Sequence, residues 1–326
     1  MTDRRTFIGA VTLGVLTAPL GAQVQRVQKM YRIGWLAGTA PVDEYWKVFI
    51  EGMRERGWIE GQNFTFERLY SDSHSERFPA LAAELVRRKV DIIVTAGTPP
   101  TTAARNATTT IPIVFFYAGD PVGSGFVANL ARPGGNITGL GGLAPGVSSK
   151  TLELLKEAMP KASRIAILVN SSLAVQAASL AEIEPAARRI GVVLSPVEIR
   201  APDELDSAFA AIARERPDAL LILGQPFMFP LRARVAALAL EQRLPAIISF
   251  KEVAEAGLLM SYGALLVDDL RRLPYYLDRI LKGTLPGEIP VEQPSRFYLT
   301  VNLKTARAIG VAIPQSLLLR ADEVIQ

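Results

Sequence analysis

An internal repeat, offset by 127 residues, limits this chain to a few architectures. Residues 91–99, Asp-Ile-Ile-Val-Thr-Ala-Gly-Thr-Pro, correspond to residues 218–226, Asp-Ala-Leu-Leu-Ile-Leu-Gly-Gln-Pro. Each copy predicts a strand, a glycine turn and a helix, and the helix ends before a proline that opens the next strand, Pro112 or Pro245. Chance similarity between two α/β units is the competing explanation. Several matching features in one order favour two tandem lobes.

Short apolar runs alternate with segments of helical periodicity along the chain. The runs predict strands at residues 31–36, 64–70, 91–96, 113–117, 164–169, 192–199, 219–223, 246–249 and 258–262. The segments between them predict helices at residues 44–56, 75–88, 101–107, 148–158, 175–190, 204–215, 229–241 and 268–282. Several runs are apolar on both faces, as a parallel strand covered by helices requires. We therefore expect an α/β fold of two doubly wound, Rossmann-like lobes with parallel sheets, joined by crossover hinges.

The amino-acid composition excludes several kinds of catalytic and binding site. The length of 326 residues suits two domains that each bury a core. The absence of cysteine excludes disulfides, thiolate catalysis, cysteine-based zinc sites and iron–sulfur clusters. A net charge of +4 without a basic run does not indicate nucleic-acid binding. We expect no cofactor and no metal site.

The first 22 residues have the three regions of a signal peptide. Arg4 and Arg5 precede an apolar run from Phe7 to Leu20, which is too short to span a bilayer. Small residues follow, and we expect cleavage after Ala22. The arginine pair fits either the twin-arginine or the general secretory route. The prediction is a periplasmic protein, and the alternative is a cytoplasmic protein with a frayed apolar terminus.

Loops at the carboxyl ends of parallel strands are the usual ligand sites of such sheets. Here these loops span residues 37–43, 97–101, 118–124, 170–174, 225–229 and 249–252. They contain hydroxyls, amides, backbone N–H groups and aromatic rings, without a nucleophile–base pair. The candidate ligand-binding residues are Thr39, Ala40, Thr98, Pro99, Tyr117, Asp120, Asn170, Ser171, Ser172, Gln225, Pro226, Phe250 and Tyr262.

These candidates also have purely structural alternatives. Thr98 could cap a turn or a helix N-terminus, and Asp120 could cap the turn that follows it. Tyr117, Phe250 and Tyr262 could complete a core instead of stacking on a ligand.

The ligand chemistry follows from two predicted helix N-termini. Thr98 and the pair Ser171 and Ser172 each lie where a strand leads into a helix, so both places should attract a carboxylate or similar anion. Asp120 is the acidic residue that we expect to pair with an ammonium group. An amino acid or an analogue of one fits this pattern.

Glycine-rich and proline-rich segments predict where the chain crosses between the lobes. Residues 134–142 lack the strand–turn–helix context of a dinucleotide site, so we interpret 139–142 as a hinge. Gly263 marks the second crossing and residues 290–294 the third. The resulting boundaries are 31–141 plus 264–290 for the first lobe and 142–263 plus 294–326 for the second.

Several motifs carry a family resemblance. They include Gly-Thr-Pro at 97–99, Gly-Asp-Pro-Val-Gly at 119–123, Ala-Arg-Pro-Gly-Gly-Asn-Ile-Thr-Gly at 131–139, Met-Ser-Tyr-Gly at 260–263 and Leu-Leu-Arg-Ala-Asp-Glu-Val-Ile at 318–325. Over nearly the whole mature chain the sequence resembles the ABC transporter substrate-binding protein family that includes tryptophan- and tyrosine-binding members. The resemblance implies a type I periplasmic-binding-protein fold that closes on a small molecule and delivers it to a membrane permease.

Three function classes follow, and the first is favoured. It is a monomeric periplasmic solute-binding protein that works with an ABC permease and its ATPase and does not bind nucleic acid. A ligand-sensing partner of a membrane receptor would use the same closure. An exported enzyme would need a nucleophile–base pair or a carboxylate cluster in the cleft loops, and we identify neither there.

Overall fold

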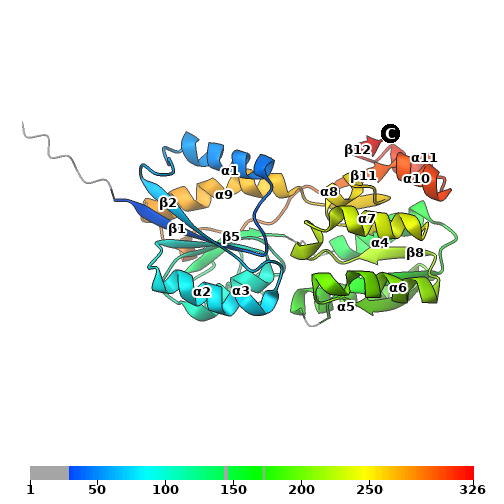
Figure 1. Cartoon of the computed structure of the whole chain (residues 1–326), viewed down its shortest axis with the longest axis horizontal. Coiled ribbons are helices and arrows are strands. Elements are labelled where there is room, and N and C mark those ends of the chain that lie inside the picture. Colours follow the sequence, from blue (N-terminus) through cyan, green and yellow to red (C-terminus); the bar gives the residue numbers. More distant parts are fainter. Residues whose placement is uncertain (1–28, 143–145, 172) are drawn as a thin grey trace, which may run out of the picture.

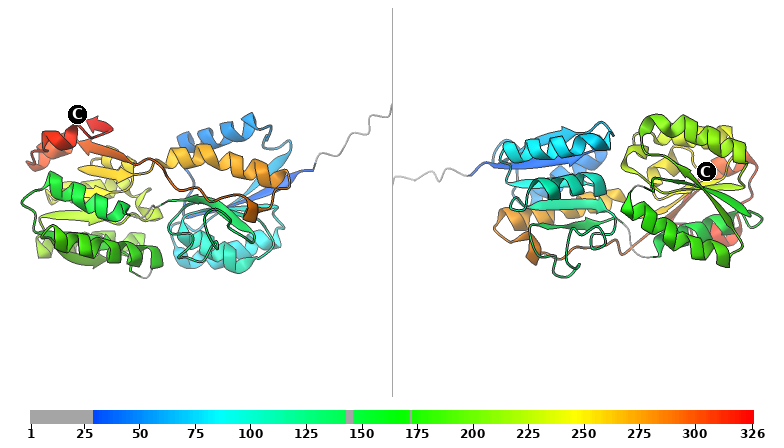
Figure 2. Two further views of the ribbon diagram at one scale, coloured as in Figure 1. Left: turned by 180° about the vertical axis from the view of Figure 1, so that it is seen from behind. Right: turned by 90° about the horizontal axis from the view of Figure 1, so that it is seen from below.

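The computed structural model describes residues 29–142, 146–171 and 173–326, which form two α/β lobes side by side (Figure 1). The predicted signal peptide lies outside the described residues. Each lobe has one central sheet with helices on both faces (Figure 2). The predicted α/β class and the two-lobe architecture are confirmed.

The first lobe contains a five-stranded parallel sheet in the order β2-β1-β3-β4-β5. Its strands are β1 (Tyr31–Ala37), β2 (Phe64–Tyr70), β3 (Ile92–Ala96), β4 (Ile113–Ala118) and β5 (Ile137–Gly141). Helices α1 (Asp43–Glu55) and α9 (Leu266–Leu281) cover one face, and α2 (Phe78–Arg87) and α3 (Thr98–Ala107) cover the other. Short 3₁₀ turns occupy Ser75–Arg77 and Pro286–Glu288.

The second lobe contains a seven-stranded sheet in the order β12-β11-β10-β9-β8-β6-β7. Its strands are β6 (Arg164–Val169), β7 (Val193–Glu198), β8 (Ala219–Ile222), β9 (Ala246–Ile248), β10 (Met260–Gly263), β11 (Tyr298–Asn302) and β12 (Glu323–Ile325). One face packs against α4 (Val147–Ala158), α5 (Ala174–Arg189), α10 (Leu303–Ile309) and α11 (Gln315–Leu318). The other face packs against α6 (Leu205–Glu215), α7 (Arg232–Glu241) and α8 (Lys251–Glu255), with 3₁₀ turns at Pro202–Glu204 and Pro226–Met228.

The sequence repeat corresponds to a structural repeat. Strands β7-β6-β8-β9-β10 have the same spatial order as β2-β1-β3-β4-β5. The aspartate that opens each copy makes equivalent bonds: the Asp91 carboxylate accepts from the Arg32 N–H at 2.8 Å, and the Asp218 carboxylate accepts from the Arg164 N–H at 2.9 Å. Both aspartates therefore fix the start of a central strand against its neighbour, and the lobes are true tandem copies of one topology.

The second sheet departs from the prediction of purely parallel strands. Strand β11 pairs antiparallel with β10, and β12 then pairs parallel with β11. We did not predict these two strands or helices α8, α10 and α11. The helices have only four to seven residues, and the pairing of β11 depends on residues far away in the sequence.

Part of the glycine-rich stretch that we interpreted as a hinge forms a strand. Residues 137–141 form β5, a buried strand paired with β4. Gly139 has φ +152°, and a Cβ there would lie 2.0 Å from the Phe115 carbonyl oxygen. A Cβ on Gly263 would lie 2.1 Å from the Ser249 carbonyl oxygen. Close contact with the neighbouring backbone therefore requires glycine at both positions.

The chain passes between the lobes after β5, after β10 and after the segment around Glu292, which bonds to Gly139 and Gly141 before the chain enters β11. Helix α9 follows β10 in the sequence, yet it packs beside α1 in the first lobe (Figure 2). The carboxyl ends of the parallel strands in both sheets face the space between the lobes, whereas β11 and β12 run in the opposite direction.

Candidate functional site

Two adjoining cavities lie between the lobes and share Gly97 and Tyr117. We call the first the hydroxyl cavity; it is lined by Thr98, Pro99, Ser148, Thr151, Leu173, Gln176, Ser179, Leu221, Leu223 and Ser249, among others. We call the second the aromatic cavity; it is lined by Trp35, Thr39, Ala40, Tyr45, Phe116, Phe229, Phe250, Leu266 and Leu270, among others. They enclose about 770 and 710 Å³ of space between the side chains, which includes open solvent.

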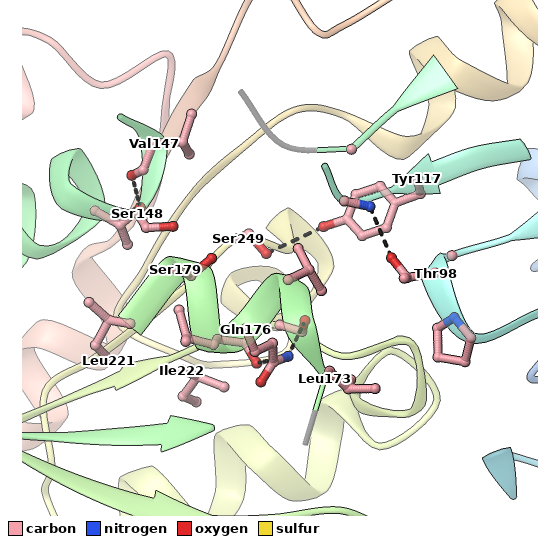
Figure 3. Close-up of a pocket in the computed structure, with 18 residues that line it drawn as sticks. Thr98, Tyr117, Val147, Ser148, Leu173, Gln176, Ser179, Leu221, Ile222 and Ser249 are labelled. Carbon is pink, nitrogen blue, oxygen red and sulfur yellow. Dashed lines mark hydrogen bonds between the residues drawn. The ribbon is translucent and has the colours of Figure 1, made fainter. Parts of the chain in front are cut away.

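Tyr117 forms a wall of both cavities. It lies near the end of β4 with φ +54°, a conformation that costs a non-glycine residue free energy and often marks a functional site. Its ring stacks on Phe250 at 5.3 Å between centroids, and its hydroxyl lies 3.4 Å from Ser249 Oγ (Figure 3). Burial raises the pKa of the Tyr117 hydroxyl, so the group stays neutral. These contacts join the first lobe to the second across the cleft.

The first-lobe wall of the hydroxyl cavity is the start of α3. Gly97 turns the chain with φ +95°, and Thr98 Oγ1 accepts a hydrogen bond from the Gly119 N–H at 3.1 Å (Figure 3). The helix begins at Thr98, three residues before the predicted start, because Pro99 and Pro100 suit a first turn. The two prolines also remove N–H groups, so this helix end offers fewer donors to an anion than we predicted.

The second-lobe wall comes from α4 and α5. The Gln176 amide donates to the carbonyls of Leu223 and Gly224, and its oxygen accepts from the Asn170 N–H at 2.7 Å. These bonds hold Gln176 in place, so it shapes the wall of the cavity.

Ser148 on α4 and Ser179 on α5 differ from Gln176. They are only 9% and 8% exposed, and neither hydroxyl hydrogen-bonds to any described residue. Figure 3 shows both side chains at the cavity.

The structure brings six of the predicted site residues to the two cavities. Thr39, Ala40 and Phe250 line the aromatic cavity, Thr98 and Pro99 line the hydroxyl cavity, and Tyr117 lines both.

Three other candidates from the second lobe do not line these cavities. Asn170 is buried behind Gln176, and the exposed Ser171 donates its N–H to Glu198. Gln225 is buried and donates to the Ile199 carbonyl at 3.1 Å. Ser172 lies outside the described residues, and Pro226 opens the 3₁₀ turn at Pro226–Met228.

Asp120 and Tyr262 have structural roles instead. Asp120 is exposed with φ +33°, and its carboxylate accepts from the Gly123 N–H at 2.8 Å. It therefore caps a turn, which was the structural alternative. Tyr262 packs on Phe297 at 5.9 Å between centroids, away from both cavities.

Charge is absent from the described lining of both cavities. No Asp, Glu, Lys, Arg or His contributes to either wall among these residues. In the same described part of the chain, no group of three or more His, Asp or Glu side chains could hold a metal ion. The arrangement suits reversible binding through apolar contact and hydroxyl hydrogen bonds.

Comparison with known proteins decides the family. The family described as ABC transporter substrate binding protein matches residues 39–325. The chain belongs to this family.

Individual relatives of this substrate-binding protein agree with that assignment. A tyrosine-binding protein of Clostridioides difficile is 27% identical over 288 residues, which cover 87% of this chain and 81% of the relative. A conserved domain protein from Vibrio cholerae aligns with 91% of this chain and 100% of its own, with 27% identity and a TM-score of 0.83. A domain from Streptococcus pneumonia in complex with L-Trp has the same coverage and TM-score at 24% identity. These structures share the type I periplasmic-binding-protein fold.

Sequence reasoning missed the polar residues that this substrate-binding protein places on helices. Ser148, Thr151, Gln176 and Ser179 lie on α4 and α5, outside the loops at the strand ends. All four are buried polar residues on otherwise apolar helix faces. That pattern was the available signal, because buried polar groups need partners.

Proposed function

We propose that this substrate-binding protein captures an amino acid or related carboxylate with an aromatic group and delivers it to an ABC permease and its ATPase. The observation that supports this most is the pair of cavities between the lobes. Six aromatic side chains line one cavity, and hydroxyls and aliphatic groups line the other. A ring with a short polar tail matches this division. Tyrosine and L-Trp, the ligands of two relatives, have this shape.

Isothermal titration calorimetry on the purified protein tests the ligand class. The panel is L-tryptophan, L-tyrosine, L-phenylalanine, their arylpropionate counterparts without the amine, and glucose as a control. We expect at least one aromatic carboxylate to bind with a Kd of about 10 μM or tighter, and glucose not to bind. Binding of the sugar alone would contradict the proposed class.

Delivery and location are separate parts of the proposal. No helix in the described ranges is long and apolar enough to cross a membrane. We propose export by residues 1–22, which predicts a secreted protein whose first residue is Gln23.

Deleting the gene should abolish uptake of the bound compound. Unchanged uptake would favour the sensor partner instead.

A further inference from the structure

We infer that the ligand carries a carboxylate but no ammonium group, and that the hydroxyls of Ser148 and Ser179 hold that carboxylate. The inference rests on the proposed function and narrows its ligand class from amino acids and carboxylates to arylalkanoates. It also departs from the amino acids named for the relatives. The evidence for this ligand class is the set of charged groups, helix dipoles and unpaired hydroxyls that face the cavities.

The described walls offer no counter-charge to an ammonium group. Acidic side chains are missing from the described lining of both cavities. An ammonium or a carboxylate transferred from water to such a site loses hydration without gaining an ion pair, so helix dipoles and hydroxyls decide which of the two groups is favoured. A zwitterionic α-amino acid would have to bring this group into the cleft.

The nearest acidic groups have other partners or face elsewhere. Glu252 accepts the Tyr45 hydroxyl at the edge of the aromatic cavity. Asp120 is exposed and caps its own turn. Asp269 is buried, but it lines a different cavity, beside Arg272 and Glu292 at the crossing of the chain between the lobes.

Helix dipoles make the hydroxyl cavity favourable to an anion. The first turns of α3 and α5 both reach its wall, through Thr98 and Val175. These helices have 10 and 16 residues, and the positive end of each dipole therefore points into the cleft. The same field opposes an ammonium group.

Two unpaired hydroxyls provide the second, independent observation. Ser148 and Ser179 are each more than nine-tenths buried, come from neighbouring helices and lack a hydrogen-bond partner among the described residues. Both line the hydroxyl cavity (Figure 3). A ligand that accepts from both hydroxyls would gain two hydrogen bonds at the wall of the cavity. The two oxygens of a carboxylate can accept one bond from each serine.

Calorimetry with matched compounds tests the inference on the whole protein. 3-Phenylpropionate and L-phenylalanine differ only in the amine, as do indole-3-propionate and L-tryptophan, and 2-phenylethylamine carries the amine without the carboxylate. We expect each arylpropionate to bind at least about 10-fold more tightly than its amino acid, and the amine not to bind. Ser148→Ala and Ser179→Ala should each weaken arylpropionate binding about 10-fold.

Ser149→Ala is the matched control, because its hydroxyl lies on the same helix but donates to the Glu182 carbonyl at 3.1 Å, outside the cavity. This variant should keep the wild-type affinity, and circular dichroism should show all three variants folded.

The outcomes separate the inference from the proposed function. An amino acid that binds as tightly as its arylpropionate overturns the inference and leaves the proposed function intact. Folded serine variants with wild-type affinity overturn the assignment of the two hydroxyls. No binding of any carboxylate up to about 1 mM overturns the proposed function itself.

Discussion

Asp269 is a carboxyl group whose charged form is destabilised by burial in the folded protein. It lies in the first turn of α9, is 9% exposed, and its Oδ2 has no hydrogen-bond partner among the described residues. Burial raises the pKa of Asp269 to about 7, and the negative charges of Asp268 and Glu292 add to the shift. Arg272 does not relieve it, because this guanidinium pairs with Glu292 at 2.7 Å.

This raised pKa predicts a pH-dependent stability. Between about pH 4 and pH 7 the native state keeps a proton that the unfolded chain has released, so the free energy of unfolding falls as the pH rises. Asp269→Asn should remove this part of the decline and raise the melting temperature at pH 8 relative to wild type. Urea unfolding at pH 5 and pH 8 measures the difference, with the exposed Asp203→Asn as control. An identical pH dependence in wild type and Asp269→Asn would refute the assignment.

The site was predictable in part, residue by residue. Thr98, Tyr117 and Phe250 follow from one rule, since the carboxyl ends of parallel strands face the ligand. Asp120 also follows the carboxyl end of a strand. Its left-handed backbone and its bond to Gly123 nevertheless leave its side chain exposed. Ser148 was missed because it lies on a helix and not in a loop at the end of a strand.

At the scale of elements, β5 shows how glycine can be misinterpreted. The sequence Ile-Thr-Gly-Leu-Gly contains two glycines in five residues, and these glycines suggested a flexible hinge. The strand forms because Gly139 lets the backbone approach Phe115 of β4, a contact that no local pattern reveals. Strands β3, β4, β6 and β8 were predictable because each is a compact apolar run.

The tight packing of β5 gives a stability prediction. Gly139→Ala places a Cβ against the Phe115 carbonyl and also strains the backbone, which should cost about 2–5 kcal/mol of unfolding free energy. Gly38→Ala is the control, because a Cβ there meets nothing within 4 Å. Chemical denaturation of both variants measures the difference. Equal stability of the two variants would contradict the close contact between Gly139 and Phe115.

At the scale of the whole molecule, the repeat explains why the site lies between the lobes. Each tandem copy directs the ends of its parallel strands to the same cleft, so two weakly polar walls line the cavities between the lobes. Contacts across the cleft include the bond from Tyr45 to Glu252 and the stack of Tyr117 on Phe250. Domain count and topology were predictable from the repeat, whereas the contacts between the lobes depend on their relative position.

A crystal structure of the protein with its tightest-binding arylpropionate tests the central claim most directly. We expect the compound to bind between the lobes, with its carboxylate oxygens about 2.5–3.0 Å from the hydroxyls of Ser148 and Ser179. We expect its ring to lie among the aromatic side chains that include Tyr117 and Phe250. A compound bound outside the cleft, or a carboxylate that contacts neither serine, would contradict the account.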